Sequence, residues 1–177
     1  IVLSGAKPVL VDVDLKTLTI DPNLIECNIN SRTKGIMVVH QFGHPAHMDE
    51  ILAIAEDKNL KIIEDNAESI GAKYKGKLAG SLGHVSTYSF FGNKIITTGE
   101  GGAVLTSDPE IARKCRELRD HGMSQDLKYY HNDLGYNFRM SNIQSAIGLA
   151  QLENFEIVLE KKIRLGERYN KNLNDIK

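Results

Sequence analysis

Two largely apolar segments, separated by a helical one, constrain the fold of this chain more than any other feature. The apolar segments are Gly35–His40 and Leu60–Glu64, and neither alternates apolar with polar side chains. Between them, apolar side chains recur at helical spacing, at Met48, Ile51, Leu52 and Ala55. Strands that lack alternation are covered on both faces, and parallel strands need a crossover to connect them. The sequence therefore predicts an α/β fold built on a parallel sheet.

The rest of the chain adds further strands and helices to this unit. We expect strands at Val9–Val13, Val85–Phe90 and Gly102–Thr106. A cap residue and a proline, Asp108–Pro109, open another helix. A long polar loop, residues 123–140, leads to Ser141, which caps a long helix. We therefore divide the chain into a large α/β domain, residues 1–140, and a long helix, residues 141–177.

Composition and charge exclude several classes of function. The chain has 177 residues, 41% of them apolar, which is enough for one domain with a substantial core. Its net charge of −1 and its pI near 6.7 give no basic field for nucleic acid or an anionic membrane. No apolar run reaches membrane-spanning length. Cys27 and Cys115 form no CxxC pair, so we expect reduced thiols in a cytoplasmic protein.

Lys94 and Asp65 point most directly to chemistry. Asp65 follows the strand Leu60–Glu64, and ligands of parallel sheets bind beyond the carboxyl ends of the strands. Lys94 lies among small and apolar residues before a glycine-rich turn. A lysine able to form a Schiff base and an aspartate at a strand end are the minimum for holding a pyridine-ring aldehyde cofactor. Taken singly, Asp65 also suits a helix cap or a loop salt bridge, and Lys94 also suits a surface position.

Two further motifs have simple structural interpretations. The glycine-rich run Thr97–Gly102 is not a P-loop, because Lys94 precedes the glycines, and we interpret it as a tight turn into the next strand. Asn137 and Arg139, at the end of the long loop, suit either anion binding or packing of the loop against the following helix. Spacing alone does not separate these alternatives.

Three histidines, His40, His44 and His47, lie close together in the sequence. Pro45 interrupts the stretch, so His40 and His44 do not share one helical face. No cysteine or acidic cluster completes a ligand set, and we expect no metal site. His40 follows a strand, which is compatible with a substrate contact or with a plain turn.

Five segments, in order, resemble the DegT/DnrJ/EryC1/StrS family of sugar aminotransferases, which use pyridoxal 5′-phosphate. The segments are Val39–Asp49, Glu64–Ala72, Gly80–Gly83, Tyr88–Gly102 and Leu134–Ser141. They are spread over residues 39–141, which is most of the chain, and five in the family's order are highly specific. The phrase Ser89–Lys94 looks most like the GDP-perosamine synthase branch. The resemblance implies a three-layer α/β/α sandwich, the PLP-dependent transferase fold type I, like the large domain of aspartate aminotransferase.

The resemblance also implies roles for individual residues. Lys94 matches the lysine that bonds to the cofactor aldehyde, and Asp65 matches the aspartate on the pyridine nitrogen. Ala67 matches the small residue packed on the ring face. Glu68 matches a position, often Gln or His in relatives, that contacts the ring hydroxyl. Ser89 matches the serine that binds the cofactor phosphate.

The resemblance extends to assembly and to chain length. Asn137 matches the asparagine that reaches the phosphate of the neighbouring subunit's cofactor, which implies a homodimer with shared active sites. Relatives begin before Ile1, where a phosphate-binding turn and a stacking aromatic residue lie, and they continue past Lys177 into a small domain. The chain has no initiator methionine and ends inside a helical pattern, so we expect a piece of a longer protein.

The implied activity is amino transfer, from L-glutamate as the expected amino-acid donor, to a nucleotide-linked 4-keto-6-deoxy sugar. Such a reaction serves aminosugar and polysaccharide or O-antigen biosynthesis. A dehydratase branch of the family has His in place of the lysine, so Lys94 favours amino transfer. The alternative is a catalytically silent fragment, or a regulatory or dimerisation domain that keeps the fold; intact Lys94, Asp65 and Ser89 weigh against it. A nucleotide-binding dehydrogenase is excluded, because no GxGxxG follows a strand.

Overall fold

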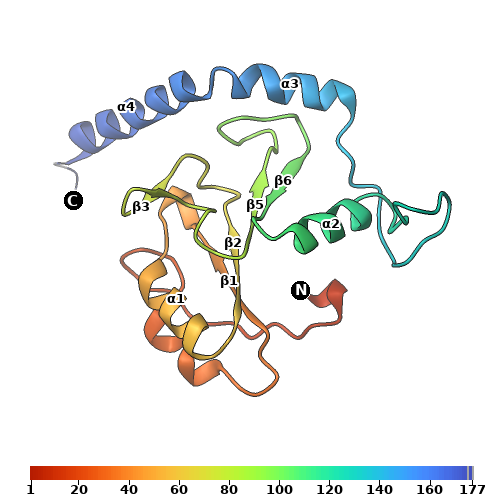
Figure 1. Cartoon of the computed structure of the whole chain (residues 1–177). Coiled ribbons are helices and arrows are strands. Elements are labelled where there is room, and N and C mark those ends of the chain that lie inside the picture. The colour runs from red at the N-terminus through yellow and green to blue at the C-terminus, as the bar shows by residue number, and fades with distance from the viewer. Residues whose placement is uncertain (175, 177) are drawn as a thin grey trace.

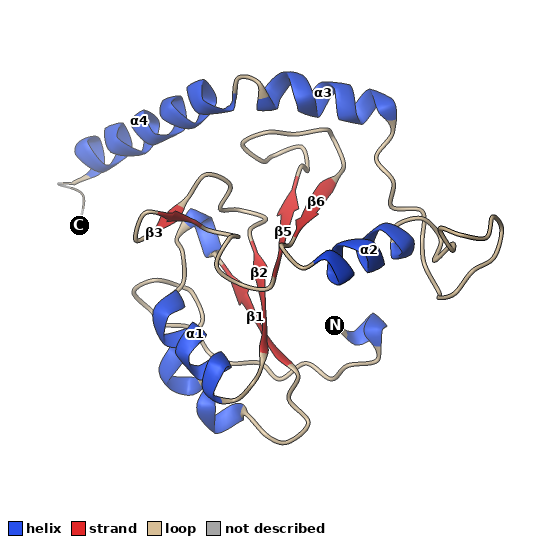
Figure 2. Cartoon of the chain, viewed as in Figure 1, coloured by secondary structure: helices blue, strands red, loops and turns tan. Residues whose placement is uncertain are grey.

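A sheet of four strands organises residues 1–174 and 176, the part of the chain that the computed structural model describes (Figures 1 and 2). In spatial order its strands are β1 (Gly35–Val39), β2 (Lys61–Asp65), β5 (Val85–Ser89) and β6 (Gly102–Leu105). A small antiparallel hairpin consists of β3 (Lys73–Tyr74) and β4 (Lys77–Leu78). The helices are α1 (Met48–Asp57), α2 (Pro109–Leu118), α3 (Asn142–Leu152) and α4 (Phe155–Leu173). Short 3₁₀ turns lie at Val2–Ser4, Pro22–Leu24, Glu26–Asn28 and Gln41–Gly43.

The parallel strands end at one edge of the sheet. The end of β1 pairs with the end of β2, at Val39 and Asp65, and β2 is in turn parallel to β5. β6 is antiparallel to β5, so Ser89 lies opposite Gly102, and the loop 90–101 closes at the same edge. The predicted α/β fold is confirmed. The prediction of a parallel sheet covered on both faces holds only in part, because β6 is antiparallel and the residues of β1 alternate between exposed and buried. This edge collects the segments that carry the predicted site residues.

Helix α1 packs on β1 and β2 and closes the hydrophobic core. The buried members of the core are Ile25, Ile36, Val38, Ala46, Met48, Ile51, Ala55, Leu60 and Ile62. Burial of each large aliphatic side chain contributes roughly 1.5–3 kcal/mol. The helix ends in a Schellman motif, in which Asn59 takes a φ of 51° and the N–H of Leu60 donates to the carbonyl of Ala55 at 2.8 Å. The motif returns the chain directly into β2.

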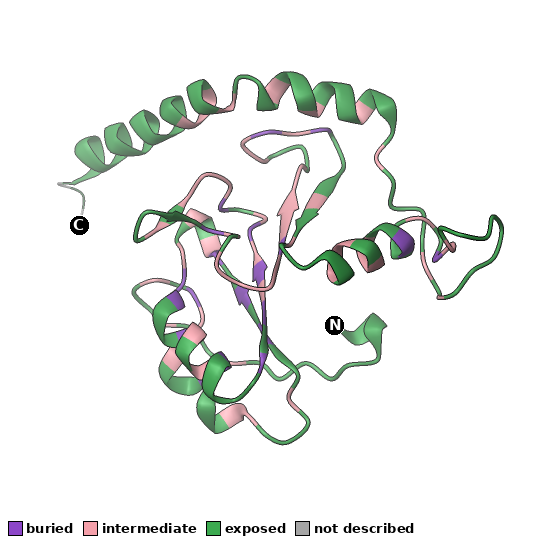
Figure 3. Cartoon of the chain, in the orientation of Figure 1, coloured by how far each residue is buried: buried purple, intermediate pink, exposed green. Residues whose placement is uncertain are grey.

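Helices α3 and α4 pass over the carboxyl edge of the sheet (Figure 1). The side-chain amide of Gln151 accepts the N–H of Thr97 at 3.0 Å, and the amide of Gln144 donates to the carbonyl of Glu100 at 3.0 Å. Polar side chains therefore fix α3 to the loop 90–101, and neither helix contains a buried residue (Figure 3). In the described part of the chain, no helix combines the length and the apolar character needed to cross a membrane.

The prediction of a strand at Val9–Val13 is wrong. This segment forms only an isolated bridge, between Val13 and Ile20, and Leu10 is 90% exposed. β-branched residues favour strands through packing and pairing with a neighbour, and none of the strands within the described residues pairs with this segment. Strand propensity without a partner is not enough to form a ladder.

The single long helix expected for residues 141–177 is divided into α3 and α4. Ser141 caps α3 as expected, and its hydroxyl accepts the N–H of Gln144 at 3.3 Å. The break falls at Asn154, whose side-chain amide donates to the carbonyl of Ala150 at 2.9 Å. A short amide side chain that binds the backbone competes with helical hydrogen bonding, which explains the break. Residues 175 and 177 of the expected helix lie outside the described residues.

The loop between β4 and β5 depends on Gly80, whose φ is +89°. A methyl group at Gly80 would lie 2.1 Å from the hydroxyl of Tyr88 and 2.8 Å from the side-chain nitrogen of Asn66. Tyr88 is itself fixed, because its hydroxyl donates to the carbonyl of Ala79 at 2.8 Å. Gly76 has a similar φ of +85°, but a methyl group there would meet nothing within 4 Å. An alanine at Gly76 would therefore add backbone strain alone, whereas an alanine at Gly80 would add both backbone strain and steric overlap.

Replacing Gly80 by alanine should lower the free energy of unfolding by about 3–4 kcal/mol, whereas Gly76→Ala should lower it by only about 1 kcal/mol. Both variants place an alanine at positive φ, but only the first adds overlap with a fixed side chain. Urea unfolding of the two variants, followed by circular dichroism, measures the difference. Equal losses would contradict the tight packing around Gly80.

Candidate active site

A pocket of about 290 Å³ opens at the carboxyl edge of the sheet. Its wall residues are Phe42, Ala67, Glu68, Ile70, Asn93, Lys94 and Ile95. They come from the turn after β1, the segment after β2 and the loop after β5. These segments meet because parallel strands place their carboxyl ends together. Three residues predicted from the sequence, Ala67, Glu68 and Lys94, therefore share one pocket.

Lys94 directs its amino group toward Glu68. The Nζ atom of Lys94 lies 3.7 Å from Oε1 of Glu68, and the lysine side chain is 18% exposed. The second carboxylate oxygen, Oε2, accepts the backbone N–H of Phe42 at 2.9 Å. Because the carboxylate is partly exposed, the ion pair contributes at most about 1 kcal/mol. Its main consequence is geometric, since one carboxylate contacts both a wall residue and the amino group.

Asp65 and Ser89 lie at the same edge, at the last positions of β2 and β5. Oδ1 of Asp65 accepts the N–H of Ala67 at 3.0 Å, which fixes the turn from the strand into the pocket wall. A carboxylate has two oxygens and accepts further donors. The hydroxyl of Ser89 accepts the N–H of Phe91 at 3.3 Å, at the start of the loop that carries Lys94. Asp65 and Ser89 are not wall residues of the pocket, but both lie on segments that continue into its wall.

Asn137 lies elsewhere, in the long loop between α2 and α3. It is exposed and forms a β-bridge with Asp120. Arg139, the other residue proposed for anion binding, places its Nε atom 3.4 Å from Oδ1 of Asp120. The structure thus brings Asn137 and Arg139 together near Asp120, apart from the Lys94 pocket. A role for Asn137 at a neighbouring subunit's site stays a prediction.

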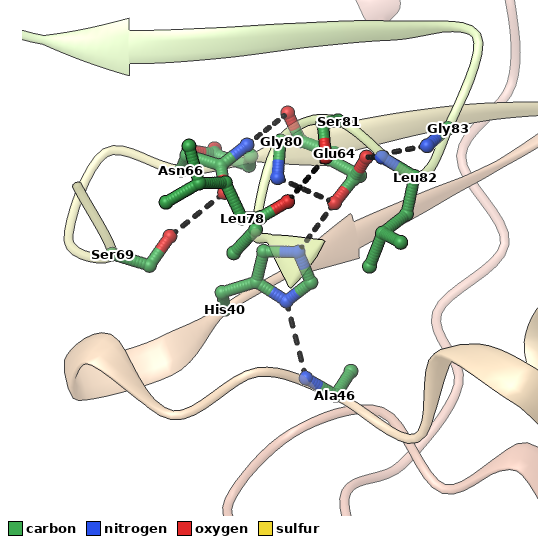
Figure 4. A network of polar contacts seen from close by, with 12 residues as sticks. His40, Ala46, Glu64, Asn66, Ser69, Leu78, Gly80, Ser81, Leu82 and Gly83 are labelled. Atoms are coloured by element: carbon green, nitrogen blue, oxygen red, sulfur yellow. Dashed lines mark hydrogen bonds and ion pairs between the residues drawn. The ribbon is translucent and has the colours of Figure 1, made fainter. Parts of the chain in front are cut away.

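A buried polar pair joins β2 to the end of β1 (Figure 4). Nε2 of His40 lies 2.9 Å from Oε2 of Glu64, and neither side chain is exposed. Nδ1 of His40 accepts the N–H of Ala46 at 3.1 Å, so the ring proton lies on Nε2 and is donated to Glu64. Glu64 also accepts the backbone N–H groups of Gly80 and Leu82, each at 2.7 Å, and of Gly83.

The carboxyl group of Glu64 is ionised although it has no contact with solvent. Burial raises its pKa, but the hydrogen bonds from His40 and from three backbone N–H groups outweigh burial and lower the pKa below the ordinary value of 4.5. A carboxyl whose pKa is lowered by folding stabilises the folded state above the ordinary pKa. That stabilisation is lost as the pH falls through the lowered folded-state pKa.

Sequence reasoning missed Glu64 and Phe42. Glu64 shares the buried face of β2 with Ile62, and a charged residue at an inward position of an apolar strand is the signal that identifies it. Phe42 takes a φ of 53°, which the sequence does not predict, because positive φ is unusual for a bulky residue. His40, expected in a substrate contact or a turn, has the turn role: it precedes the turn Gln41–Gly43, and both of its ring nitrogens have partners inside the protein. Among the described residues, His, Cys, Asp and Glu side chains form no group of three or more able to hold a metal ion.

The DegT/DnrJ/EryC1/StrS aminotransferase family model matches residues 1–177. A GDP-perosamine synthase of Caulobacter vibrioides is 50% identical over 169 residues, which cover 96% of this chain and 46% of that protein. The chain spans about half the length of the curated relatives it matches.

Solved structures match the fold closely. Helicobacter pylori PseC, an aminotransferase involved in the biosynthesis of pseudoaminic acid, superposes with a TM-score of 0.92 at 32% identity and covers 98% of this chain and 47% of that one. The E. coli GDP-4-keto-6-deoxy-D-mannose-3-dehydratase with bound hydrated PLP superposes with a TM-score of 0.86 at 30% identity, over 94% of this chain and 47% of that one. The predicted type I transferase fold is confirmed.

Replacing Glu64 by glutamine should lower the free energy of unfolding at pH 7 by on the order of 3 kcal/mol, because the new amide group would face N–H donors. The difference from the native protein should shrink as the pH falls from about 4.5 through the lowered folded-state pKa, since protonation removes the same interaction. Urea unfolding between pH 7 and pH 3 measures both effects. A difference independent of pH would contradict an ionised Glu64 in the folded protein.

Proposed function

The chain belongs to the DegT/DnrJ/EryC1/StrS aminotransferase family, and on that premise we propose that the whole protein is a pyridoxal 5′-phosphate-dependent sugar aminotransferase. The single observation that carries the proposal is the position of Lys94. Its amino group lines a pocket together with Ala67 and Glu68, at the edge where Asp65 ends its strand. An amine, a small wall residue and a nearby carboxylate are the groups that such a cofactor needs.

The residues of this edge fit pyridoxal 5′-phosphate by the chemistry of their side chains. Lys94 supplies the amine for the aldehyde, and Asp65 supplies a carboxylate for the ring nitrogen. Ala67 leaves room for a flat ring beside the wall, Glu68 is an acceptor for the ring hydroxyl, and the hydroxyl of Ser89 is a donor for phosphate. The E. coli dehydratase that superposes on this chain has PLP bound, which supports the same cofactor here.

When bound, the cofactor supplies an aldehyde that captures amines and a protonated ring that withdraws electrons from a neighbouring carbanion. Asp65 keeps the ring nitrogen protonated through the charge of its carboxylate. Lys94 would bind the cofactor aldehyde through its amino group, and as a free amine it would carry a proton between two carbons. Glu68 holds the amino group of Lys94 toward the pocket.

The proposed substrates are L-glutamate as amino donor and a nucleotide-linked 4-keto-6-deoxy sugar as acceptor. The support for a nucleotide sugar is the similarity to a GDP-perosamine synthase and to a dehydratase named for a GDP-linked keto-sugar. The product would serve aminosugar and polysaccharide or O-antigen biosynthesis. We further propose a homodimer in which Asn137 reaches the phosphate site of the neighbouring subunit, consistent with its exposed position.

In the full-length protein, Lys94→Ala should abolish the yellow, borohydride-reducible adduct with pyridoxal 5′-phosphate and lower turnover by at least about 10³-fold, because the same amine binds the cofactor and moves the proton. Absorbance spectroscopy and mass mapping of the reduced adduct give the readout.

The control is Lys75→Ala, which removes a lysine that is 69% exposed and paired with Asp49, outside the pocket wall. Lys75→Ala should keep the adduct and the turnover. An adduct that persists in Lys94→Ala would overturn the assignment of the lysine. Absence of any adduct in the native protein would favour a catalytically silent member of the family.

A further inference from the structure

Glu64 and His40 form a fully buried pair that the proposed chemistry leaves without a role. Neither side chain has exposed surface. A buried ionised group contributes little net stability, because desolvation offsets its attraction to a partner, and apolar residues of similar volume often serve as well. The presence of a charge at this position therefore needs an explanation other than stability. Its contacts supply one.

The carboxylate of Glu64 joins β2 to the loop before β5. Each of its oxygens accepts two donors. The donors are Nε2 of His40 and the backbone N–H groups of Gly80, Leu82 and Gly83 (Figure 4). Since all of them are N–H groups, a carboxylate satisfies them and a neutral amide of the same shape does not. Asp65 is the next residue in the chain, so fixing Glu64 also fixes the strand end that carries Asp65.

His40 extends the restraint from Glu64 to the turn after β1. Through Nε2 its ring donates to Glu64, and through Nδ1 it accepts the N–H of Ala46 at 3.1 Å. Its backbone N–H donates to the carbonyl of Asp65 at 3.1 Å. The turn 41–46 is therefore attached at both ends, to the strand end by the backbone of His40 and to the buried carboxylate through its ring.

This turn presents Phe42 to the pocket. Phe42 has a φ of 53°, which is unfavourable for a bulky residue and persists only where its surroundings impose it. Phe42 is 74% exposed, so packing of the ring does not impose the conformation. Its N–H donates to Glu68, whose other oxygen faces Nζ of Lys94. The turn 41–46 thus fixes the position of Glu68 through the N–H of Phe42. Glu68 in turn fixes the amino group of Lys94.

We propose that Glu64 and His40 are positioning residues for the pocket that contains Lys94. A buried carboxylate and its imidazole partner hold the turn after β1 and the end of β2 in one relative arrangement. Neither residue is among the wall residues of the pocket in the described part of the chain, so both act through the backbone they fix. The effect on cofactor binding rests on the proposed function, whereas the positioning concerns the protein's own contacts.

Four variants of the full-length protein separate positioning from stability. Glu64→Gln removes the charge, and Glu64→Asp keeps it on a shorter side chain. His40→Gln keeps an amide donor near Glu64 but has no acceptor at the position of Nδ1, which binds Ala46. Glu117→Gln is the matched control, because Glu117 is also a buried acid, 6% exposed, but pairs with Arg113 on α2.

The two readouts are amide hydrogen exchange, followed by mass spectrometry of peptides covering residues 41–46, and the Kd for pyridoxal 5′-phosphate. Both are measured at a temperature where every variant is folded. We expect Glu64→Gln and His40→Gln to increase exchange in residues 41–46 and to raise the Kd by about tenfold or more. Glu64→Asp should recover part of both effects. Glu117→Gln should change exchange only around α2 and leave the Kd unchanged.

The inference is wrong if Glu64→Gln and His40→Gln lower stability while exchange in residues 41–46 and the Kd both stay native. If Glu64→Gln does not fold, His40→Gln decides the outcome alone, because it keeps the contact with Glu64 and breaks only the one with Ala46. If the native protein does not bind the cofactor, the proposed function fails. In that case, the exchange of residues 41–46 still tests the positioning.

Discussion

The carboxylate of Glu64 is the contact on which the arrangement of the carboxyl edge depends. It lies between two strands and two loops, and it accepts four N–H donors without any exposure to solvent. Removing a charge from water is costly, and the cost is offset here only because all of the donors converge. The requirement for convergence makes the geometry specific: the loop 79–83 and the His40 ring have to be in place together.

Several residues of the site follow Glu64 closely in the sequence. Asp65 leaves β2 directly after Glu64, and its carboxylate shapes the turn to Ala67. Glu68, one residue further, faces Lys94, which lies in the loop between β5 and β6. Helix α3 fixes the far side of that loop through the amide of Gln151. The backbone at this edge is therefore fixed on one side by the buried carboxylate of Glu64 and on the other side by helix α3.

Much of the fold was predictable because its signals are local. The apolar strands, the spacing of α1 and the caps at Asp108 and Ser141 each depend on neighbours in sequence, and the structure confirms them. The strand predicted at Val9–Val13 was wrong, because a strand also needs a partner and no strand among the described residues pairs with this segment. The helix break at Asn154 was missed because a single side chain's hydrogen bond overrides a continuous helical pattern.

For the site, too, some features could be predicted from local sequence and others depend on contacts between distant segments. Ala67, Glu68 and Lys94 were expected together and line one pocket, because strand ends meet at a predictable edge. The positive φ of Phe42 was not predictable, since it arises from the contact with Glu68 in the folded chain. Glu64 was visible in the sequence as a charge in an apolar strand, but its four donors come from segments that only folding brings together.

We propose above that the carboxyl edge of the sheet holds pyridoxal 5′-phosphate between Lys94 and Asp65. A crystal structure of the full-length protein grown with the cofactor tests it most directly. We expect continuous electron density from Nζ of Lys94 to the cofactor, with the Asp65 carboxylate within hydrogen-bonding distance of the ring nitrogen. A cofactor bound elsewhere, with Lys94 still directed at Glu68, would contradict it.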